Sequence, residues 1–227
     1  MFALGLINIV RFNFLADKLM PYCNWKNSSE INQKYHDTEW GIPLHDDRKQ
    51  FEFLMLEAMQ CGLNWDLIIN KREIFRRCFD DFDYDKIALY TENDIMRILA
   101  VEGMIKSRRK IEAIIHNAKY FQAIRAEKGS FCNYLWQFSD NKTIIYDKHG
   151  DGFIPTCNGL SDKISKDLKK RGFKFLGSIT VYSHLQATGI INDHDKNCPL
   201  YSYINTHFPT IYKRPDAEKQ VQDFSKL

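Results

Sequence analysis

The chain has 227 residues, of which 44% are hydrophobic and 27% charged, and it carries a net charge of +3 at pH 7. This length allows one full hydrophobic core, or one core with a small satellite, and the composition is that of a globular protein. A charge this small does not identify a polyanionic partner by itself. Partners must therefore be inferred from local clusters of charge.

The cysteines favour a reduced environment or a metal site over disulfides. Six are present, at positions 23, 61, 78, 132, 157 and 198. No two of them form a Cys-x-x-Cys pair, and the chain shows no secretory context.

The stretch from Met1 to Leu19 is apolar and is followed by Met20. Its apolar run is too short to span a bilayer, and it lacks both a basic leader and a small-residue cleavage site. We expect residues 1–19 to be an extension of doubtful origin, either upstream translation or a loosely attached appendage. We also expect a cytoplasmic protein with no membrane partner.

Taken in order, the remaining residues predict an all-α fold. Residues 20–45 are polar and predict a loop. Helices are predicted over 46–61, 66–79, 84–89, 91–100, from Ser107 to beyond Phe121, over 130–138, from Ser161 to Gly172, and over 180–188. Thr91 and Asp94 resemble a capping box. Residues 139–159 predict a long loop, with 143–146 as a weak strand candidate. We expect one domain over 20–205 and a frayed tail over 206–227.

The helix predicted over 46–61 contains an acid in an apolar setting. From Phe51 to Cys61 the charged residues are Glu52 and Glu57, and Gly62 ends the helix before Trp65. A carboxylate buried there must have a partner, a shifted pKa or a function. The alternative is a solvated acid at the edge of an amphipathic face, and the pattern alone does not decide between them.

A second group of residues has the composition of a metal site. His194 and Cys198 form a His-x3-Cys pair, and Cys23 and His36 lie near the start of the chain. Two cysteines and two histidines complete a closed tetrahedral zinc shell, which is structural rather than catalytic. The spacing is weak, and four unrelated residues remain the alternative at this point.

A helix, a tight turn at Gly103 and a second helix suggest a hairpin that offers backbone N–H groups to a DNA phosphate. The basic residues Lys106, Arg108, Arg109 and Lys110 follow at once, where they oppose the positive end of the helix dipole. An ordinary helical hairpin with a solvated basic turn is the alternative. A further cluster at Lys163, Lys166, Lys169, Lys170, Arg171 and Lys174 could extend a phosphate-tracking surface.

Large aromatic residues gather around the acidic helix, at Trp25, Tyr35, Trp40 and Trp65. Such residues are usually core, but around a buried carboxylate they suggest a pocket for a flat cationic ring. The chain contains no nucleotide-phosphate motif, no serine-hydrolase elbow and no zinc-deaminase signature.

Several ordered motifs resemble the bacterial 3-methyladenine DNA glycosylase I family. They are Cys23-Asn24-Trp25, the stretch from Tyr35 to Pro43, the stretch from Glu57 to Trp65, Lys71-Arg72-Glu73, the stretch from Lys169 to Gly177, and Asn192-Asp193-His194. The resemblance runs from about Met20 to Tyr201. Departures include Cys61 and Asn64, where the family usually has alanine and serine.

The resemblance implies a helix-hairpin-helix glycosylase core, with a zinc-bound part formed by about 20–45 and 190–205. It assigns Cys23, His36, His194 and Cys198 as ligands of a structural zinc. Glu57 would be the catalytic residue that hydrogen-bonds the base, with Tyr35, Trp65 and Trp25 in the base pocket. Gly103, Lys106, Arg108 and Lys110 would contact DNA.

The function implied is flipping and hydrolytic excision of 3-methyladenine from double-stranded DNA by a monomer, without strand cleavage. Two other classes stay open from the residues themselves. A zinc-stabilised DNA-binding module would recognise alkylated bases without excising them. A small-molecule enzyme would use Glu57 as a general base.

Overall fold

The computed structural model describes Cys23 and residues 29–215. Its helices, short 3-10 turns (η) and strands are α1 (Glu30–Thr38), α2 (Asp47–Gln60), α3 (Trp65–Asn70), α4 (Arg72–Cys78), η2 (Asp80–Phe82), α5 (Tyr84–Ile87), α6 (Glu92–Ala100), α7 (Arg108–Lys128), α8 (Phe131–Trp136), η3 (Gln137–Ser139), β1 (Thr143–Tyr146), η4 (His149–Asp151), α9 (Gly159–Arg171), α10 (Ser178–Ala187), α11 (Pro199–His207) and β2 (Thr210–Lys213). The fold is mostly helical, as predicted. In the described part of the chain no helix is both long and apolar enough to cross a membrane.

Helix α2 lies at the centre of the fold, and every residue from Gln50 to Met59 is buried. The helix starts where the sequence predicts, because the Asp46 side chain accepts a hydrogen bond from the backbone N–H of Lys49 at 2.8 Å. Each large apolar side chain buried along α2 contributes about 1.5–3 kcal/mol. Helices α3, α7, α8 and α10 pack around it.

Asp47 joins the first turn of α2 to the neighbouring helices. Its carboxylate accepts backbone N–H bonds from Phe131 and Cys132 at 3.1 and 2.9 Å, at the start of α8. It also pairs with Arg125 of α7 at 3.1 Å. These contacts fix the position of α2 relative to α7 and α8.

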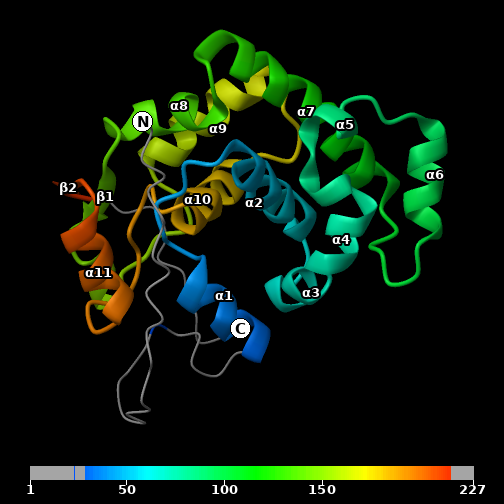
Figure 1. Ribbon diagram of the computed structural model, residues 1–227. Helices are drawn as coiled ribbons and strands as arrows, with labels where there is room; N and C mark the ends of the chain where they lie inside the picture. Colours follow the sequence, from blue (N-terminus) through cyan, green and yellow to red (C-terminus); the bar gives the residue numbers. More distant parts are fainter. Residues whose placement is uncertain (1–22, 24–28, 216–227) are drawn as a thin grey trace, which may run out of the picture.

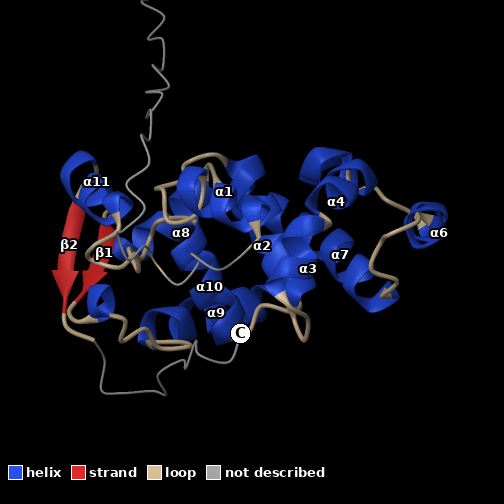
Figure 2. Cartoon of the chain, turned by 90° about the horizontal axis from the view of Figure 1, so that it is seen from below, coloured by secondary structure: helices blue, strands red, loops and turns tan. Residues whose placement is uncertain are grey.

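The prediction of an all-α fold is wrong in one respect, because β1 and β2 form a small parallel sheet (Figure 2). Thr143 pairs with Thr210, so the partner strand comes from the segment predicted as a tail. The loop predicted over 139–159 likewise contains β1 and η4. The strand candidate at 143–146 is confirmed as β1. The sequence signal was weak because all four residues are buried and therefore show no alternation.

Several helix boundaries also differ from the prediction. The segment 20–45 contains α1, whose polar composition concealed a buried face formed by Asn32, Tyr35 and His36. The helix predicted over 66–79 is divided at Lys71 into α3 and α4. Helix α9 begins after Asn158, which forms a capping box with Ser161, so Ser161 is not itself the cap residue.

Other local signals are confirmed. Thr91 and Asp94 form the predicted capping box at the start of α6. Ser107 precedes α7 in the cap position, but its side chain makes no capping hydrogen bond. In both views of the molecule, the sheet and α11 lie at one end and α6 lies at the opposite end, with α2 between them (Figures 1 and 2).

Candidate active site and metal centre

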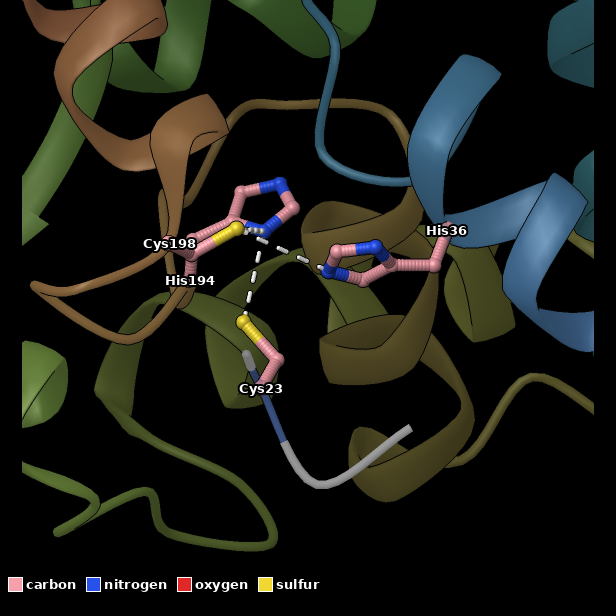
Figure 3. Close-up of side chains that lie close together, drawn as sticks. All are labelled: Cys23, His36, His194 and Cys198. Carbon is pink, nitrogen blue, oxygen red and sulfur yellow. Dashed lines mark hydrogen bonds between the residues drawn. The ribbon is translucent and has the colours of Figure 1, made fainter. Parts of the chain in front are cut away.

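Two cysteines and two histidines come together at a buried site formed by both ends of the described chain (Figure 3). Cys23 comes from the start, His36 from α1, and His194 and Cys198 from the segment between α10 and α11. Their ligand atoms all lie within 4.8 Å of one another. The sequence spacing alone left this grouping undecided, and the fold brings the four together.

The donor geometry fits one tetrahedral metal ion. The Sγ atoms of Cys23 and Cys198 each lie 3.6 Å from His194 Nδ1, and Cys198 Sγ lies 3.9 Å from His36 Nε2. Metal–sulfur bonds of about 2.3 Å and metal–nitrogen bonds of about 2.0–2.1 Å separate such donors by about 3.4–3.8 Å. The printed distances lie at or close to this range, so the four residues suit one bound metal ion.

Neighbouring groups orient both imidazole rings. His36 Nδ1 lies 2.8 Å from Asp37 Oδ1, which leaves Nε2 toward the thiols. His194 Nε2 lies 3.2 Å from the backbone oxygen of Trp40, which leaves Nδ1 toward the thiols. Such outer contacts are typical of metal-binding histidines. A Cβ on Gly41 would lie 2.5 Å from His194 Nε2, so only glycine fits beside this ring.

The carboxyl of Glu57 is buried in α2, with 7% of the residue exposed. Among the described residues it has no hydrogen bond or ion pair, and burial raises its pKa to about 8. The sequence left the role of this acid open between a solvated edge position and a buried one. The structure shows it buried, which makes it a candidate to bind a cationic or hydrogen-bond-donating ligand.

Aromatic rings from three helices contact one another, and one of them, Tyr35, lies near Glu57. The Tyr35 ring of α1 lies 5.4 Å from the Trp65 ring of α3 and 5.9 Å from the Phe53 ring of α2, centroid to centroid. Burial, and next the nearby charge of Glu57, raise the pKa of the Tyr35 phenol well above its usual range. The buried indole N–H of Trp65 has no acceptor among the described residues. An acid and an indole donor without partners in the described residues, beside a cluster of aromatic rings, suit a flat polar ligand.

The turn between α6 and α7 has the expected shape. Gly103 adopts φ +77°, and a Cβ there would lie 2.9 Å from Ile74 Cδ1, so the position requires glycine. Its backbone oxygen accepts a hydrogen bond from Lys71 Nζ at 2.5 Å.

The basic side chains after this turn have different surroundings. Lys106 is exposed, with no ion pair or hydrogen bond to the described part of the chain. Arg108 pairs with two glutamates, Glu92 and Glu112. Lys110 is half-buried and donates to the backbone of α2.

The second basic cluster, on α9, does not form one surface with the turn at Gly103. Lys163, Lys166 and Lys170 of α9 line a shallow cleft with Lys128, at the C-terminal end of α7. The turn at Gly103 precedes the N-terminal end of this 21-residue helix, which is about 30 Å long. These three lysines of α9 therefore lie far from the turn at Gly103, and they do not form one continuous phosphate-tracking surface with it.

Comparison with known proteins identifies the group to which this site belongs. The family model described as methyladenine glycosylase matches residues 25–201. DNA-3-methyladenine glycosylase 1 of Escherichia coli (strain K12) is 40% identical over 182 residues, covering 80% of this chain and 97% of the relative. The chain belongs to the methyladenine glycosylase family. The resemblance inferred from the motifs is thereby confirmed.

Solved structures of the family have the same fold. A crystal structure of 3-methyladenine DNA glycosylase I aligns with a TM-score of 0.75 and 42% identity, over 79% of this chain and 98% of that one. A variant of 3-methyladenine DNA glycosylase I, solved in complex with 3-methyladenine, aligns with a TM-score of 0.74 and 36% identity. It covers 78% of this chain and 95% of that chain.

Arg72 belongs to one of the motifs that carry the resemblance, but the sequence assigned it no role in the site. Arg72 of α4 is buried and forms two hydrogen bonds of 2.7 Å to the Glu39 carboxylate and one of 2.8 Å to Glu52. Its guanidinium lies 5.7 Å from the centre of the Tyr35 ring and 5.4 Å from that of Phe53. The apolar setting of Glu52 was the available signal, but its partner lies in another helix.

One predicted member of the base pocket, Trp25, lies outside the described residues. The other two, Tyr35 and Trp65, lie together as the resemblance implies. Their roles toward a base are taken up below.

Proposed function

We infer that the protein is a DNA glycosylase that excises 3-methyladenine from alkylated DNA. Membership of the methyladenine glycosylase family supports this activity, and so does the match to a relative solved with 3-methyladenine bound. The observation that carries the assignment in this chain is the buried Glu57 carboxyl without a partner in the described residues, beside Tyr35 and Trp65.

The pocket chemistry suits a base that already carries positive charge. A cationic adenine is a good leaving group, so little acid catalysis is needed. Stacking of the cationic ring on Trp65 would contribute about 0.5–2 kcal/mol. The positive ring would lower the pKa of Glu57 and hold it as a carboxylate, which accepts hydrogen bonds from the exocyclic amine. Such charge-assisted bonds contribute about 1.5–3 kcal/mol.

Hydrolysis would complete the reaction. The target base must leave the stack before its glycosidic bond can be reached. Water would then attack the sugar carbon as positive charge develops on the sugar, and DNA phosphates with Glu57 would stabilise that charge. Lys110 contacts the end of α2, but its amine is already bound to the backbone oxygens of Met59 and Cys61. We therefore expect no Schiff base and no strand cleavage.

We propose that the metal held by Cys23, His36, His194 and Cys198 is a structural zinc. Two thiolates and two imidazoles make a closed tetrahedral set with no position left for substrate. The donor distances and the oriented rings support this choice. When bound, zinc would cross-link the first part of the described chain to the segment before α11. Elemental analysis should find about one zinc per chain, and a folded protein without metal would contradict the proposal.

DNA contact is assigned to the α6–α7 unit, as a helix-hairpin-helix module. The required glycine at 103 and the exposed Lys106 support this role, because a glycine turn before a helix presents N–H groups to phosphate. Arg108 is the first residue of α7, the helix that follows this turn. Duplex DNA is the expected partner and the monomer the expected state, since one chain supplies all the groups named.

The test is release of free 3-methyladenine from methylated duplex DNA, measured by chromatography. The wild-type protein should release it, and the Glu57→Gln variant should bind DNA normally but excise about 10- to 100-fold more slowly. Glu30→Gln is a matched control, because Glu30 is exposed at the start of α1. No release by the wild-type protein above the protein-free rate would overturn the assignment.

A further inference from the structure

The amine of Lys110 is bound to the end of α2. Its Nζ lies 2.6 Å from the backbone oxygen of Met59 and 2.8 Å from that of Cys61. The last carbonyls of a helix have no partner within the helix, and a cation there is favoured by the helix dipole. These two bonds use two of the three N–H donors of the ammonium group. Lys110 therefore differs from a lysine that is free to follow a phosphate.

The same end of α2 is held from two other directions. Cys61 Sγ lies 3.6 Å from the backbone oxygen of Phe175 and 3.5 Å from Thr180 Oγ1 of α10. Phe175 adopts φ +60°, a left-handed conformation that is rare for an aromatic residue and persists only where its surroundings require it. The guanidinium of Arg109, the neighbour of Lys110, lies 6.0 Å from the centre of the Phe175 ring. The first turn of α7 thus reaches the end of α2 both directly and through Phe175.

This point of attachment lies between two groups of the base pocket. Glu57 precedes Cys61 by about one helical turn, and the Cys61 thiol lies 3.7 Å from the Glu57 backbone oxygen. The chain then reverses at Gly62, with φ +75°, and α3 begins at Trp65. Any shift in the last turn of α2 changes the position of the Glu57 carboxyl relative to the Trp65 ring.

We propose that Lys110 is a positioning residue for base excision and not a phosphate ligand. It ties the first turn of the hairpin's second helix to the last turn of α2, and so fixes Glu57 relative to Trp65. The hairpin and the base pocket then move as one unit, so that a duplex held by the hairpin presents its flipped base at a set distance from Glu57. This role rests on the proposed excision of 3-methyladenine.

The experiment compares Lys110→Met with Lys106→Met, which removes an exposed amine on the same turn. Three quantities are measured for each: the salt dependence of binding to undamaged duplex, the single-turnover excision rate at saturating protein, and the affinity for free 3-methyladenine. Lys110→Arg is the conservative variant, since its guanidinium can still donate to the α2 carbonyls. Thermal melting establishes that each variant is folded.

We expect Lys110→Met to keep the wild-type salt slope while excising about 10- to 100-fold more slowly, because small misplacements of reacting groups cost rates of this order. It should also bind the free base more weakly, and Lys110→Arg should recover most of both losses. Lys106→Met should lower the salt slope by about 0.9 and leave free-base affinity unchanged.

A Lys110→Met protein with a slope lowered by about 0.9 and normal base affinity would overturn the proposal and make Lys110 a phosphate contact. If Lys110→Met does not fold, the Lys110→Arg variant decides. Wild-type base affinity and a wild-type excision rate in Lys110→Arg would support positioning. Weakened base affinity with a normal excision rate would contradict it. Failure of the wild-type protein to release 3-methyladenine would instead overturn the proposed function.

Discussion

Tyr35 and His36 are consecutive residues of α1 that serve different sites. The Tyr35 ring lies 5.4 Å from the Trp65 ring in the base pocket, whereas His36 Nε2 lies 3.9 Å from the Cys198 thiol in the metal centre. Neighbouring helical positions point about 100° apart, so one short helix supplies a ring to the proposed base pocket and a donor to the candidate metal centre. The metal centre therefore holds the helix that carries Tyr35.

Metal removal should accordingly weaken base binding. Once the metal is chelated, α1 loses its link to Cys198, and Tyr35 should no longer be fixed against Trp65. We expect the affinity for free 3-methyladenine to fall by about 10- to 100-fold, as measured by calorimetric titration. Melting temperature should fall too, since metal binding is coupled to folding. Added zinc should restore both quantities, and unchanged base affinity in metal-free protein would show that α1 is held without the metal.

The raised pKa of Glu57 predicts how stability varies with pH. Its pKa is about 8 in the folded protein, against 4.5 for an unperturbed glutamate, so between these values the folded state binds more protons than the unfolded state. The free energy of unfolding should therefore decrease as pH rises through this window, by up to about 1.4 kcal/mol per pH unit from this group. Glu57→Gln removes the effect, so the variant should be more stable than the wild-type protein by a margin that grows with pH.

Urea denaturation at pH 5, 6, 7 and 8 measures this margin for both proteins. Glu30→Gln, with its exposed carboxyl at the start of α1, controls for a change of charge alone. A margin that stays constant across the series would show that Glu57 is ionised in the folded protein throughout.

The same group should shape the pH dependence of excision. The proposed mechanism needs Glu57 as a carboxylate, and kcat/KM reports the ionisation of the free enzyme. We expect kcat/KM to rise about tenfold per pH unit up to about pH 8 and then level, since burial raises the Glu57 pKa to about 8. The residual activity of Glu57→Gln should lack this rise. A wild-type profile that is flat from pH 6 to 9 would assign the role to another group.

The features that the sequence predicted are those that depend on residues close together in the chain. The acid at 57, the glycine at 62 and the tryptophan at 65 lie within one short stretch, so their proximity follows from their small separation along the chain. The capping box at the start of α6 was likewise readable from four residues. By contrast, Thr143 pairs with Thr210, and no local pattern of so short a strand specifies a partner that distant.

The metal centre and the arginine contacts show the same limit in the site. The four metal donors come from segments at both ends of the chain, and their spacing became specific only through the family resemblance. Arg72 was visible as part of the motif Lys71-Arg72-Glu73, but nothing in that motif indicated which carboxylates it binds. Its partner Glu39 directly follows α1, and its partner Glu52 lies in α2. The packing of these two segments against α4 determines the contact.

Substitution of Arg72 should destabilise the protein more than substitution of its neighbour Arg76. The Arg72 side chain is 7% exposed and contacts two carboxylates, whereas Arg76 is 31% exposed. Arg72→Met leaves the half-buried Glu39 without this partner and leaves the buried Glu52 with Arg76, so the loss should be up to about 3–5 kcal/mol. Arg76 also pairs with Glu52, at 2.7 Å, but Arg76→Met leaves Glu52 bound to Arg72, so the loss of this partly exposed arginine should cost about 1 kcal/mol or less. Chemical denaturation measures both losses. Because the Arg72 guanidinium lies over the Tyr35 ring, its loss should also weaken free-base binding, and equal effects of the two substitutions would mean that Arg72 does not hold the pocket.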